Sequence, residues 1–155
     1  MITCIRVHSG DAGFQQLVRE LDAHLSVING TEDDFFRQFN KIDHLQYVVV
    51  AYEEGAPVGC GAIKAYEPGA MEVKRMFVRP QQRGRGIAAK VLDELEGWAR
   101  ELGYQRCVLE TSRELTAAMG LYRKSNYSVI PNYGQYKDVT TSVCFEKILD
   151  LIPGS

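Results

Sequence analysis

The chain has 155 residues, of which 45% are hydrophobic and 25% are charged, and its net charge is −2. This length suits one hydrophobic core, so we expect residues 1–155 to form a single domain. The ordinary balance of residue types excludes a disordered or fibrous chain. The slight negative charge argues against nucleic acid as a partner.

The apolar segments indicate neither a leader peptide nor a membrane anchor. Residues 1–30 lack a charged stretch followed by an apolar one, and no apolar run reaches the roughly 20 residues of a spanning helix. The four cysteines are far apart in sequence, and no histidine spacing suits zinc. We therefore expect reduced thiols, no metal site, no membrane partner and a cytoplasmic location.

The first third of the chain predicts one strand and two helices. Residues 2–7 alternate in part between apolar and polar, which is typical of an edge strand. Apolar residues at helical spacing run from Phe14 to Leu25 and predict a first helix. Thr31 followed by Asp34 resembles a capping box and predicts a second, short helix.

Three strands are predicted in the middle of the chain. The clearest covers residues 46–52 and has Tyr47-Val-Val-Val-Ala51 at its centre. Turn sequences with Gly and Pro separate it from further strands over residues 58–65 and 72–78. Pro80 stops the last of these because it lacks the amide hydrogen that a ladder needs. The three strands are expected to form an antiparallel meander.

A glycine-rich bend and a long amphipathic helix follow this meander. Apolar residues recur at steps of three and four, so one face of a helix of about four turns is apolar. Gly103 is expected to end the helix as its C′ residue. The apolar positions are Ala88, Val91, Leu92, Leu95, Ala99 and Leu102.

The last third predicts a strand, a helix and a closing pair of strands. Residues 106–111 form the strand, and the helix from about Leu115 to Lys124 ends at Asn126, which tolerates the left-handed conformation. Residues 127–130 and 141–147 are expected to pair antiparallel. We therefore predict a mixed α/β fold with a mostly antiparallel sheet of roughly six to seven strands, flanked on both faces by about four helices.

The bend before the long helix has the composition of a phosphate-binding turn. Gly84 and Gly86 permit a sharp turn, which would present several unpaired amides at the positive end of the helix dipole. No acidic residue occurs between residues 73 and 91, so we expect a positive local field there. The basic residues concerned are Lys74, Arg75, Arg79, Arg83 and Arg85.

The same bend also matches the fingerprint of dinucleotide-binding proteins, as Gly84-x-Gly86-x-x-Ala89. That fold places the bend after its first strand and an acidic residue about 20 positions later. Here some 70 residues and several predicted strands precede the bend, although Glu110 does end a later strand. A nicotinamide-dependent enzyme is therefore a weaker alternative.

Two separated motifs resemble those of the GCN5-related N-acetyltransferase (GNAT) family. The first is Arg83-x-x-Gly86-x-Ala88 after the strand Glu72-Val-Lys-Arg-Met-Phe-Val78, which is similar to the family's acetyl-CoA-binding motif. The second is Leu109-Glu110-Thr111 followed by Ala118-x-x-Leu121-Tyr122-x-x-Ser125-Asn126-Tyr127. Together with the order of the other elements, the resemblance covers nearly the whole chain and implies a GNAT-like acyl-CoA N-acyltransferase fold.

The resemblance implies acetyl-CoA as the cosubstrate and assigns residues to it. The backbone amides of the bend would hold the pyrophosphate, and the pantetheine arm would lie along the strand before it. A peptide amide of that strand would face the thioester carbonyl. The cofactor-binding residues implied are Met76, Phe77, Val78, Arg83, Gly84, Arg85, Gly86, Ile87 and Ala88.

Two catalytic residues are likewise implied by the resemblance. Tyr122 stands at the family's Leu-Tyr position, where a phenol protonates the departing thiolate. Glu72 lies near the start of the central strand, where histone-acetylating members carry the glutamate that accepts the proton of the amine. A solvated glutamate at a strand end is an equally good reading of Glu72. Tyr127, Tyr133 and Tyr136 are expected to be structural.

The expected function is transfer of the acetyl group of acetyl-CoA to the amine of a small or amino-acid-like molecule, directly in a ternary complex. Residues 25–44 and 132–138 are expected to line the acceptor pocket. Family members often pair as dimers, so a homodimer is a further expectation. The alternative from another class is a silent acetyl-CoA-binding module that acts as a sensor or assembly domain.

Overall fold

The computed structural model describes residues 1–29 and 45–149. These residues form two compact units, of which the first comprises residues 1–29, 45–64 and 74–95 and the second comprises residues 65–73 and 96–149. Among the described residues, seven strands form hydrogen-bonded neighbours in the order β1-β2-β3-β4-β5-β7-β6. This number lies within the range that the sequence predicted.

The first unit contains two whole strands, the larger parts of two more and the helix predicted from Phe14 to Leu25. Asp11 caps that helix, because its Oδ2 accepts a hydrogen bond of 3.0 Å from the Phe14 amide. β1 is an edge strand, as predicted, and pairs antiparallel with β2, which pairs antiparallel with β3. The elements are β1 (Ile2–Val7), α1 (Ala12–Asn29), β2 (Tyr47–Glu53), β3 (Ala56–Glu67) and β4 (Ala70–Val78), followed by the 3₁₀ turn η2 (Pro80–Gln82) and the start of α3 (Ile87–Glu101).

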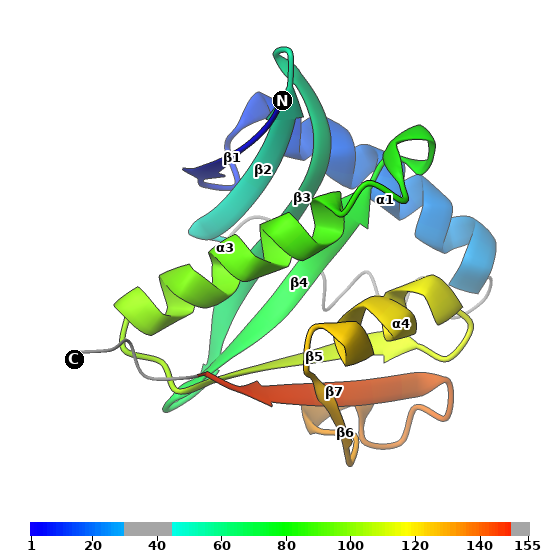
Figure 1. Cartoon of the computed structure of the whole chain (residues 1–155). Coiled ribbons are helices and arrows are strands. Elements are labelled where there is room, and N and C mark those ends of the chain that lie inside the picture. The colour runs from blue at the N-terminus through cyan, green and yellow to red at the C-terminus, as the bar shows by residue number, and fades with distance from the viewer. Residues whose placement is uncertain (30–44, 150–155) are drawn as a thin grey trace. The chain divides into compact units, whose positions relative to one another are not determined.

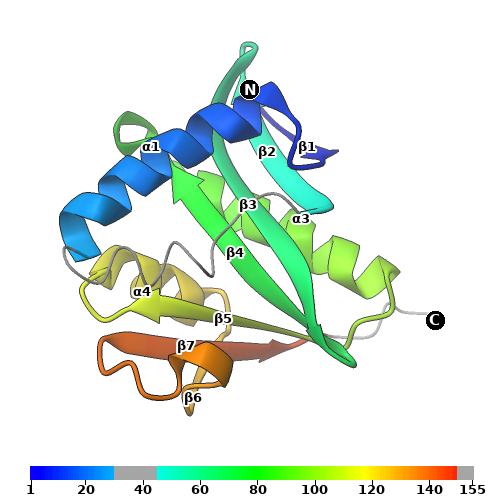
Figure 2. The same ribbon diagram turned by 180° about the vertical axis from the view of Figure 1, so that it is seen from behind.

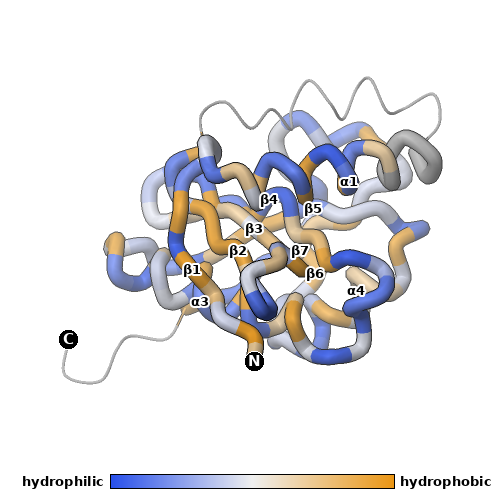
Figure 3. Tube along the Cα trace, turned by 90° about the horizontal axis from the view of Figure 1, so that it is seen from above, coloured by the Kyte–Doolittle hydropathy of each residue, from blue (hydrophilic) through white to orange (hydrophobic). Residues whose placement is uncertain are grey.

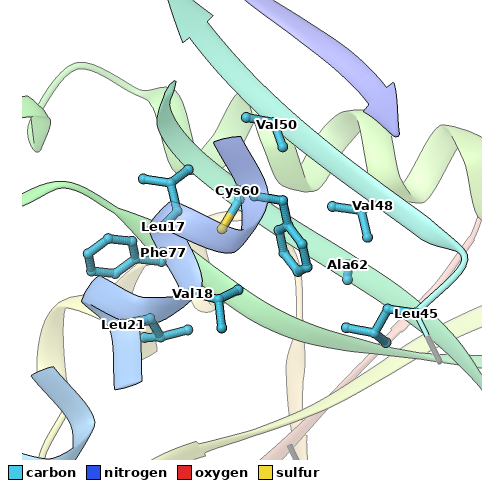
Figure 4. Close-up of a cluster of buried hydrophobic side chains, with 10 residues drawn as sticks. Leu17, Val18, Leu21, Leu45, Val48, Val50, Cys60, Ala62 and Phe77 are labelled. Atoms are coloured by element: carbon cyan, nitrogen blue, oxygen red, sulfur yellow. The ribbon is translucent and has the colours of Figure 1, made fainter. Parts of the chain in front are cut away.

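The helices α1 and α3 lie on opposite faces of the strands of this unit (Figures 1 and 2). The α1 face carries a cluster of buried side chains, shown in Figure 4, in which alternate residues of β2 and β3 meet the apolar side of the helix. The trace of β2 is orange over most of its length in Figure 3, because its central residues are apolar toward both faces. The cluster contains Phe14, Leu17, Val18, Leu21, Leu45, Val48, Val50, Cys60, Ala62 and Phe77.

The α3 face of β3 is closely approached because it carries two glycines. A β-carbon added at Gly61 would lie 2.4 Å from the sulfur of Met76 and 2.9 Å from a methyl group of Leu95. One added at Gly59 would lie 2.9 Å from Ile87. The glycines that the sequence placed in this strand thus bring α3 close to the sheet.

The second unit contains β5 (Arg106–Ser112), α4 (Thr116–Lys124), β6 (Ser128–Ile130), the 3₁₀ turn η3 (Gly134–Tyr136) and β7 (Ser142–Ile148). The start of β4 pairs with β5 in parallel over three residue pairs, the last of which is Glu72 with Val108. β5 pairs antiparallel with β7, and β6 pairs antiparallel with β7. The closing strand pair is therefore as predicted.

The predicted end of α3 at Gly103 is confirmed. At the end of α3, Gly103 has a φ of +88°, the Tyr104 amide donates to the Ala99 carbonyl and the Gly103 amide donates to the Arg100 carbonyl. These two bonds define a Schellman motif with Gly103 at C′. Leu102 was wrongly placed on the buried face: it is 39% exposed, because it follows the last helical turn.

Two of the sequence predictions concern residues that lie wholly or mostly outside the described part of the chain. The short helix predicted from Thr31 lies outside the described residues, and so does most of the segment 25–44 predicted to line the acceptor pocket. Among the residues that are described, no helix has the length and apolar character needed to cross a membrane.

Candidate active site

The glycine-rich bend of the first unit has the backbone geometry that phosphate binding needs. Gly84 and Gly86 adopt φ values of +82° and +76°, in the region that disfavours residues with a β-carbon. At both positions the space that a β-carbon would fill is empty to 4 Å. Within the described residues, the amides of residues 84–89 donate no hydrogen bond, since the first bond of α3 runs from the Lys90 amide to the Gly86 carbonyl.

A pyrophosphate suits this arrangement. Unpaired amides at the start of a helix of 15 residues donate hydrogen bonds to anions, and the aligned peptide dipoles favour negative charge at the same place. The open space over the two glycines allows the anion to approach the backbone. Residues 84–88 of the predicted set therefore have amides free for a pyrophosphate, whereas the amide of Arg83 already donates to the Pro80 carbonyl at 3.3 Å.

The local positive field predicted from the sequence is weaker than expected, because acidic residues from α1 and β2 pair with three of the arginines. Nη1 of Arg75 lies 2.6 Å from Oδ1 of Asp22. Arg79 binds Glu20 through two nitrogens, at 3.0 Å and 2.8 Å. Arg85 forms an ion pair with Glu53. The prediction counted only residues near the bend in sequence and missed these long-range partners.

Residues Met76–Val78, predicted to lie along the pantetheine arm, form the end of β4. They lie beyond the three residue pairs that join β4 to β5. Arg75, just before them, has a φ of +59°, and its carbonyl accepts a hydrogen bond of 3.4 Å from the Cys60 thiol. A non-glycine residue with positive φ inside a strand marks an irregularity of the ladder.

Tyr122 lies in α4 of the second unit, and its side chain is buried with a relative exposure of 6%. Its ring centroid lies 5.8 Å from those of both Tyr127 and Phe145. Among the described residues the hydroxyl has no hydrogen-bond partner. Burial raises the pKa of Tyr122, and the charge of Glu110 raises it further, so the phenol stays protonated at neutral pH.

The end of α4 explains why Tyr122 and Tyr127 meet. Asn126 has a φ of +73°, the Tyr127 amide donates to the Tyr122 carbonyl and the Asn126 amide donates to the Arg123 carbonyl. These bonds form a second Schellman motif, in which Tyr122 is C3 and Tyr127 is C″. Apolar contact between these two positions accompanies the motif. The spacing of the second sequence motif is thus the spacing of a helix cap that fixes the ring of Tyr122.

A buried polar cluster, which the sequence did not indicate, holds Tyr127 in turn. Glu96 of α3 is only 2% exposed, and its carboxylate accepts hydrogen bonds of 3.0 Å from the Tyr127 hydroxyl and 2.7 Å from Nζ of Lys147. Its position on the apolar stripe of α3 could have suggested a buried role. The cluster satisfies a carboxylate that would be costly to bury alone.

Glu72 is buried, with a relative exposure of 6%. The alternative prediction, a solvated glutamate at a strand end, is therefore wrong. Oε2 of Glu72 accepts a hydrogen bond of 2.6 Å from the Tyr133 hydroxyl. Tyr133 was expected to be structural, and no spacing in the sequence linked it to Glu72. The contact joins residues 61 positions apart, so only the folded chain reveals it.

Glu72 and Tyr122 lie on opposite faces of the strands of the second unit. Glu72 is in register with Val108, and Val108 is in register with Glu146 of β7. The next residue of β7, Phe145, therefore points to the other face, where it contacts Tyr122. One face thus carries a buried carboxylate and the other a buried phenol.

Three of the four cysteines are shielded from solvent. Cys60, Cys107 and Cys144 are buried and free, and burial raises the pKa of Cys60 and of Cys107 to about 12 and that of Cys144 to about 11. Such thiols are poorly ionised at neutral pH. Within residues 1–29 and 45–149, no group of three His, Cys, Asp or Glu side chains is arranged to hold a metal ion.

The sequence model described as "Acetyltransferase (GNAT) family" matches residues 15–127. A curated relative from Azospirillum brasilense, named IAA acetyltransferase, is 35% identical over 136 residues, which cover 86% of this chain and 89% of the relative. These matches span both the bend of the first unit and Tyr122 of the second.

Solved structures show the same fold. One from Klebsiella pneumoniae, assigned to the acyl-CoA N-acyltransferases, is 30% identical, has a TM-score of 0.81 and covers 97% of this chain and 99% of its own. A GNAT acetyltransferase from Elizabethkingia anophelis, solved with acetyl-CoA bound, is 16% identical, has a TM-score of 0.70 and covers 96% of this chain and 98% of its own. The predicted fold class is confirmed, and the chain belongs to the acetyltransferase (GNAT) family as an acetyl-CoA-dependent N-acetyltransferase.

Proposed function

We propose that the protein transfers the acetyl group of acetyl-CoA directly to the amine of a small molecule, with Glu72 as general base and Tyr122 as general acid. The observation that carries the proposal is the placement of a buried carboxylate and a buried phenol on opposite faces of the strands of one unit. The amine nitrogen approaches the carbonyl carbon and the thiolate sulfur leaves it. The two atoms occupy different positions, so they need separate proton-transfer groups.

The acetyl transfer requires proton transfer at both Glu72 and Tyr122. Glu72 takes a proton from the ammonium form of the acceptor, directly or through a water, and the neutral amine nitrogen attacks the thioester carbonyl. The carbon–sulfur bond then breaks, and the Tyr122 hydroxyl donates its proton to the leaving thiolate of CoA. The nitrogen then loses its second proton, which passes through solvent to the Tyr122 phenolate, and Glu72 releases to solvent the proton that it took from the ammonium. The products are the acetylated amine and free CoA.

The cofactor-binding residues are those predicted from the motif. The amides of residues 84–88 would hold the pyrophosphate, supported by their lack of other partners and by the open space at Gly84 and Gly86. The backbone of Met76–Val78 would pair with the pantetheine arm as an added strand. Of the predicted acceptor wall, the structure describes residues 132–138 and the backbone of residues 25–29, at the end of α1.

Release of free CoA thiol, measured with acetyl-CoA and a panel of small amines and amino acids, tests the proposal. Turnover of at least one amine is expected, and Glu72→Gln should lower kcat by about 100-fold or more. A chain that binds acetyl-CoA in calorimetry and acetylates no amine would be the silent sensor or assembly module. Incubation with acetyl-CoA alone should add no acetyl group to the protein by mass spectrometry, since the transfer is direct.

We further propose that the two compact units belong to one domain, that the protein pairs as a homodimer and that it works in the cytoplasm. Limited proteolysis tests the first, since a single domain yields no stable fragment, and size-exclusion chromatography with light scattering tests the second. Subcellular fractionation tests the third.

A further inference from the structure

The loop between β6 and β7 carries the residue that touches the buried carboxylate of Glu72. The Tyr133 hydroxyl donates to Oε2 of Glu72 at 2.6 Å. This distance is typical of a charge-assisted hydrogen bond between a hydroxyl and a carboxylate. Such a bond restricts rotation of the carboxylate group, because one of its oxygens is anchored.

The ring of Tyr133 is itself held from two sides. Its centroid lies 4.8 Å from that of Tyr66, on β3, and 5.7 Å from that of Tyr136, in η3. Both separations fall in the range of favourable aromatic pairs. The hydroxyl therefore has little freedom to leave Glu72.

The backbone of the loop is fixed by the side-chain amide of Asn132. Its Nδ2 lies within hydrogen-bond distance of three carbonyl oxygens, those of Tyr136 at 3.2 Å, Val139 at 3.2 Å and Ser142 at 3.1 Å. These contacts join the start of the loop to its end and to the first residue of β7. The residue next to Tyr133 in sequence thus holds the loop in the shape that brings the hydroxyl to Glu72.

The Tyr133 phenol keeps its proton at neutral pH and donates it in the hydrogen bond to Glu72. Burial raises the pKa of Tyr133, and the charge of Glu72 and the hydrogen bond to it raise that pKa further. Among the ionisable groups that interact with Glu72 are the phenols of Tyr66 and Tyr136 and the thiol of Cys144. Burial raises the pKa of these phenols and of the thiol, so the groups stay neutral. Two further charged residues lie two positions along the strands: Lys74 after Glu72 in β4, and Glu110 after Val108, the β5 residue in register with Glu72.

We propose that Tyr133 is a positioning residue for the general base: its hydroxyl holds the Glu72 carboxylate in the orientation that accepts the proton of the acceptor amine. The inference rests on the proposed role of Glu72 and adds to it the loop between β6 and β7. Tyr133 itself need not touch the acceptor or acetyl-CoA.

Steady-state kinetics of thiol release test the inference with Tyr133→Phe, which keeps the ring and removes only the hydroxyl. We expect kcat to fall about tenfold while the KM for acetyl-CoA is unchanged. The loss should therefore lie in kcat and not in cofactor binding. A residue that served only the stability of the fold would leave kcat per folded molecule unchanged.

Tyr66→Phe is the matched control. It removes a hydroxyl from the same aromatic cluster, and among the described residues that hydroxyl makes no hydrogen bond, so its kcat and its KM for acetyl-CoA should equal those of the wild type. Asn132→Ala is a second route to the same result, since it releases the loop and leaves the Tyr133 hydroxyl in place. It should also lower kcat and leave the KM for acetyl-CoA unchanged.

A double-mutant cycle with Glu72→Gln separates the possible outcomes. If Tyr133 acts through Glu72, adding Tyr133→Phe to Glu72→Gln causes no further loss. If Glu72→Gln is slow and Tyr133→Phe equals the wild type, or if the two losses multiply, the positioning role is refuted and the proposed function stands. If Glu72→Gln equals the wild type, the base assignment fails, and the inference fails with it.

Discussion

Removing the hydroxyl of Tyr122 should abolish most of the turnover and leave the stability of the fold nearly unchanged. The structure gives the reason for the second half of this prediction. Within the described residues the hydroxyl makes no hydrogen bond, although the side chain is only 6% exposed. Tyr122→Phe therefore breaks no bond, and we expect the free energy of unfolding to change by less than about 1 kcal/mol. Loss of a general acid lowers kcat by about 100-fold to 10,000-fold.

Tyr127→Phe is the matched opposite case. It removes a hydroxyl from the neighbouring buried ring, and this hydroxyl donates to Glu96 at 3.0 Å. A hydrogen bond to a carboxylate contributes about 1.5–3 kcal/mol. At about 2–4 °C per kcal/mol for a chain of this size, the melting temperature should fall by roughly 3–12 °C. The phenylalanine ring keeps the contact with Tyr122, so kcat should stay near that of the wild type.

Thermal unfolding followed by circular dichroism and thiol release under saturating acetyl-CoA measure the two quantities for both variants. Calorimetric titration with CoA should give the same affinity for Tyr122→Phe as for the wild type. Wild-type turnover by Tyr122→Phe would refute the role of the phenol as the acid. A large loss of stability in Tyr122→Phe would show that the hydroxyl has a structural partner and would refute the reasoning from its burial.

Three further predictions concern the bend, a helix cap and the thiols. Gly86→Ala should weaken CoA binding in calorimetry about tenfold, because the new methyl group fills the open space at a φ of +76°; Gly97→Ala, in the middle of α3 with equal open space, should instead raise stability by up to about 1 kcal/mol and leave binding unchanged. Asn126→Gly should raise the free energy of unfolding in urea by about 0.5 kcal/mol and Asn126→Ala should lower it by about 1 kcal/mol, since the residue sits at a φ of +73°; equal effects would contradict the cap. In native protein at about pH 8 a thiol reagent should modify Cys4, which is only half-buried, and all four cysteines should react after unfolding. Rapid native reaction of more than one thiol would contradict the protection expected of the cysteines whose pKa burial raises to about 11 or 12, Cys60, Cys107 and Cys144.

Structural features that depend only on residues close together in sequence could be predicted from the sequence alone. The buried stripe of α3 follows from apolar residues at steps of three and four, and its end follows from Gly103. The end of α4 follows from Asn126 in the same way, because both caps close hydrogen bonds between residues five positions apart or fewer. The bend at Gly84 and Gly86 is also local. These elements were predictable because the forces that form them act within one or two helical turns.

The pairing of charged and phenolic side chains, in contrast, depends on the tertiary structure. Asp22 and Glu20 of α1 reach arginines that lie 53 and 59 positions later in sequence, and they reduce the positive charge that a local count implied. Tyr133 reaches Glu72 across 61 positions and turns a strand-end glutamate into a buried, oriented carboxylate. A side chain finds such a partner only when the strands fix which face it points to and the packed loops bring the partner there, and neither composition nor spacing records that arrangement.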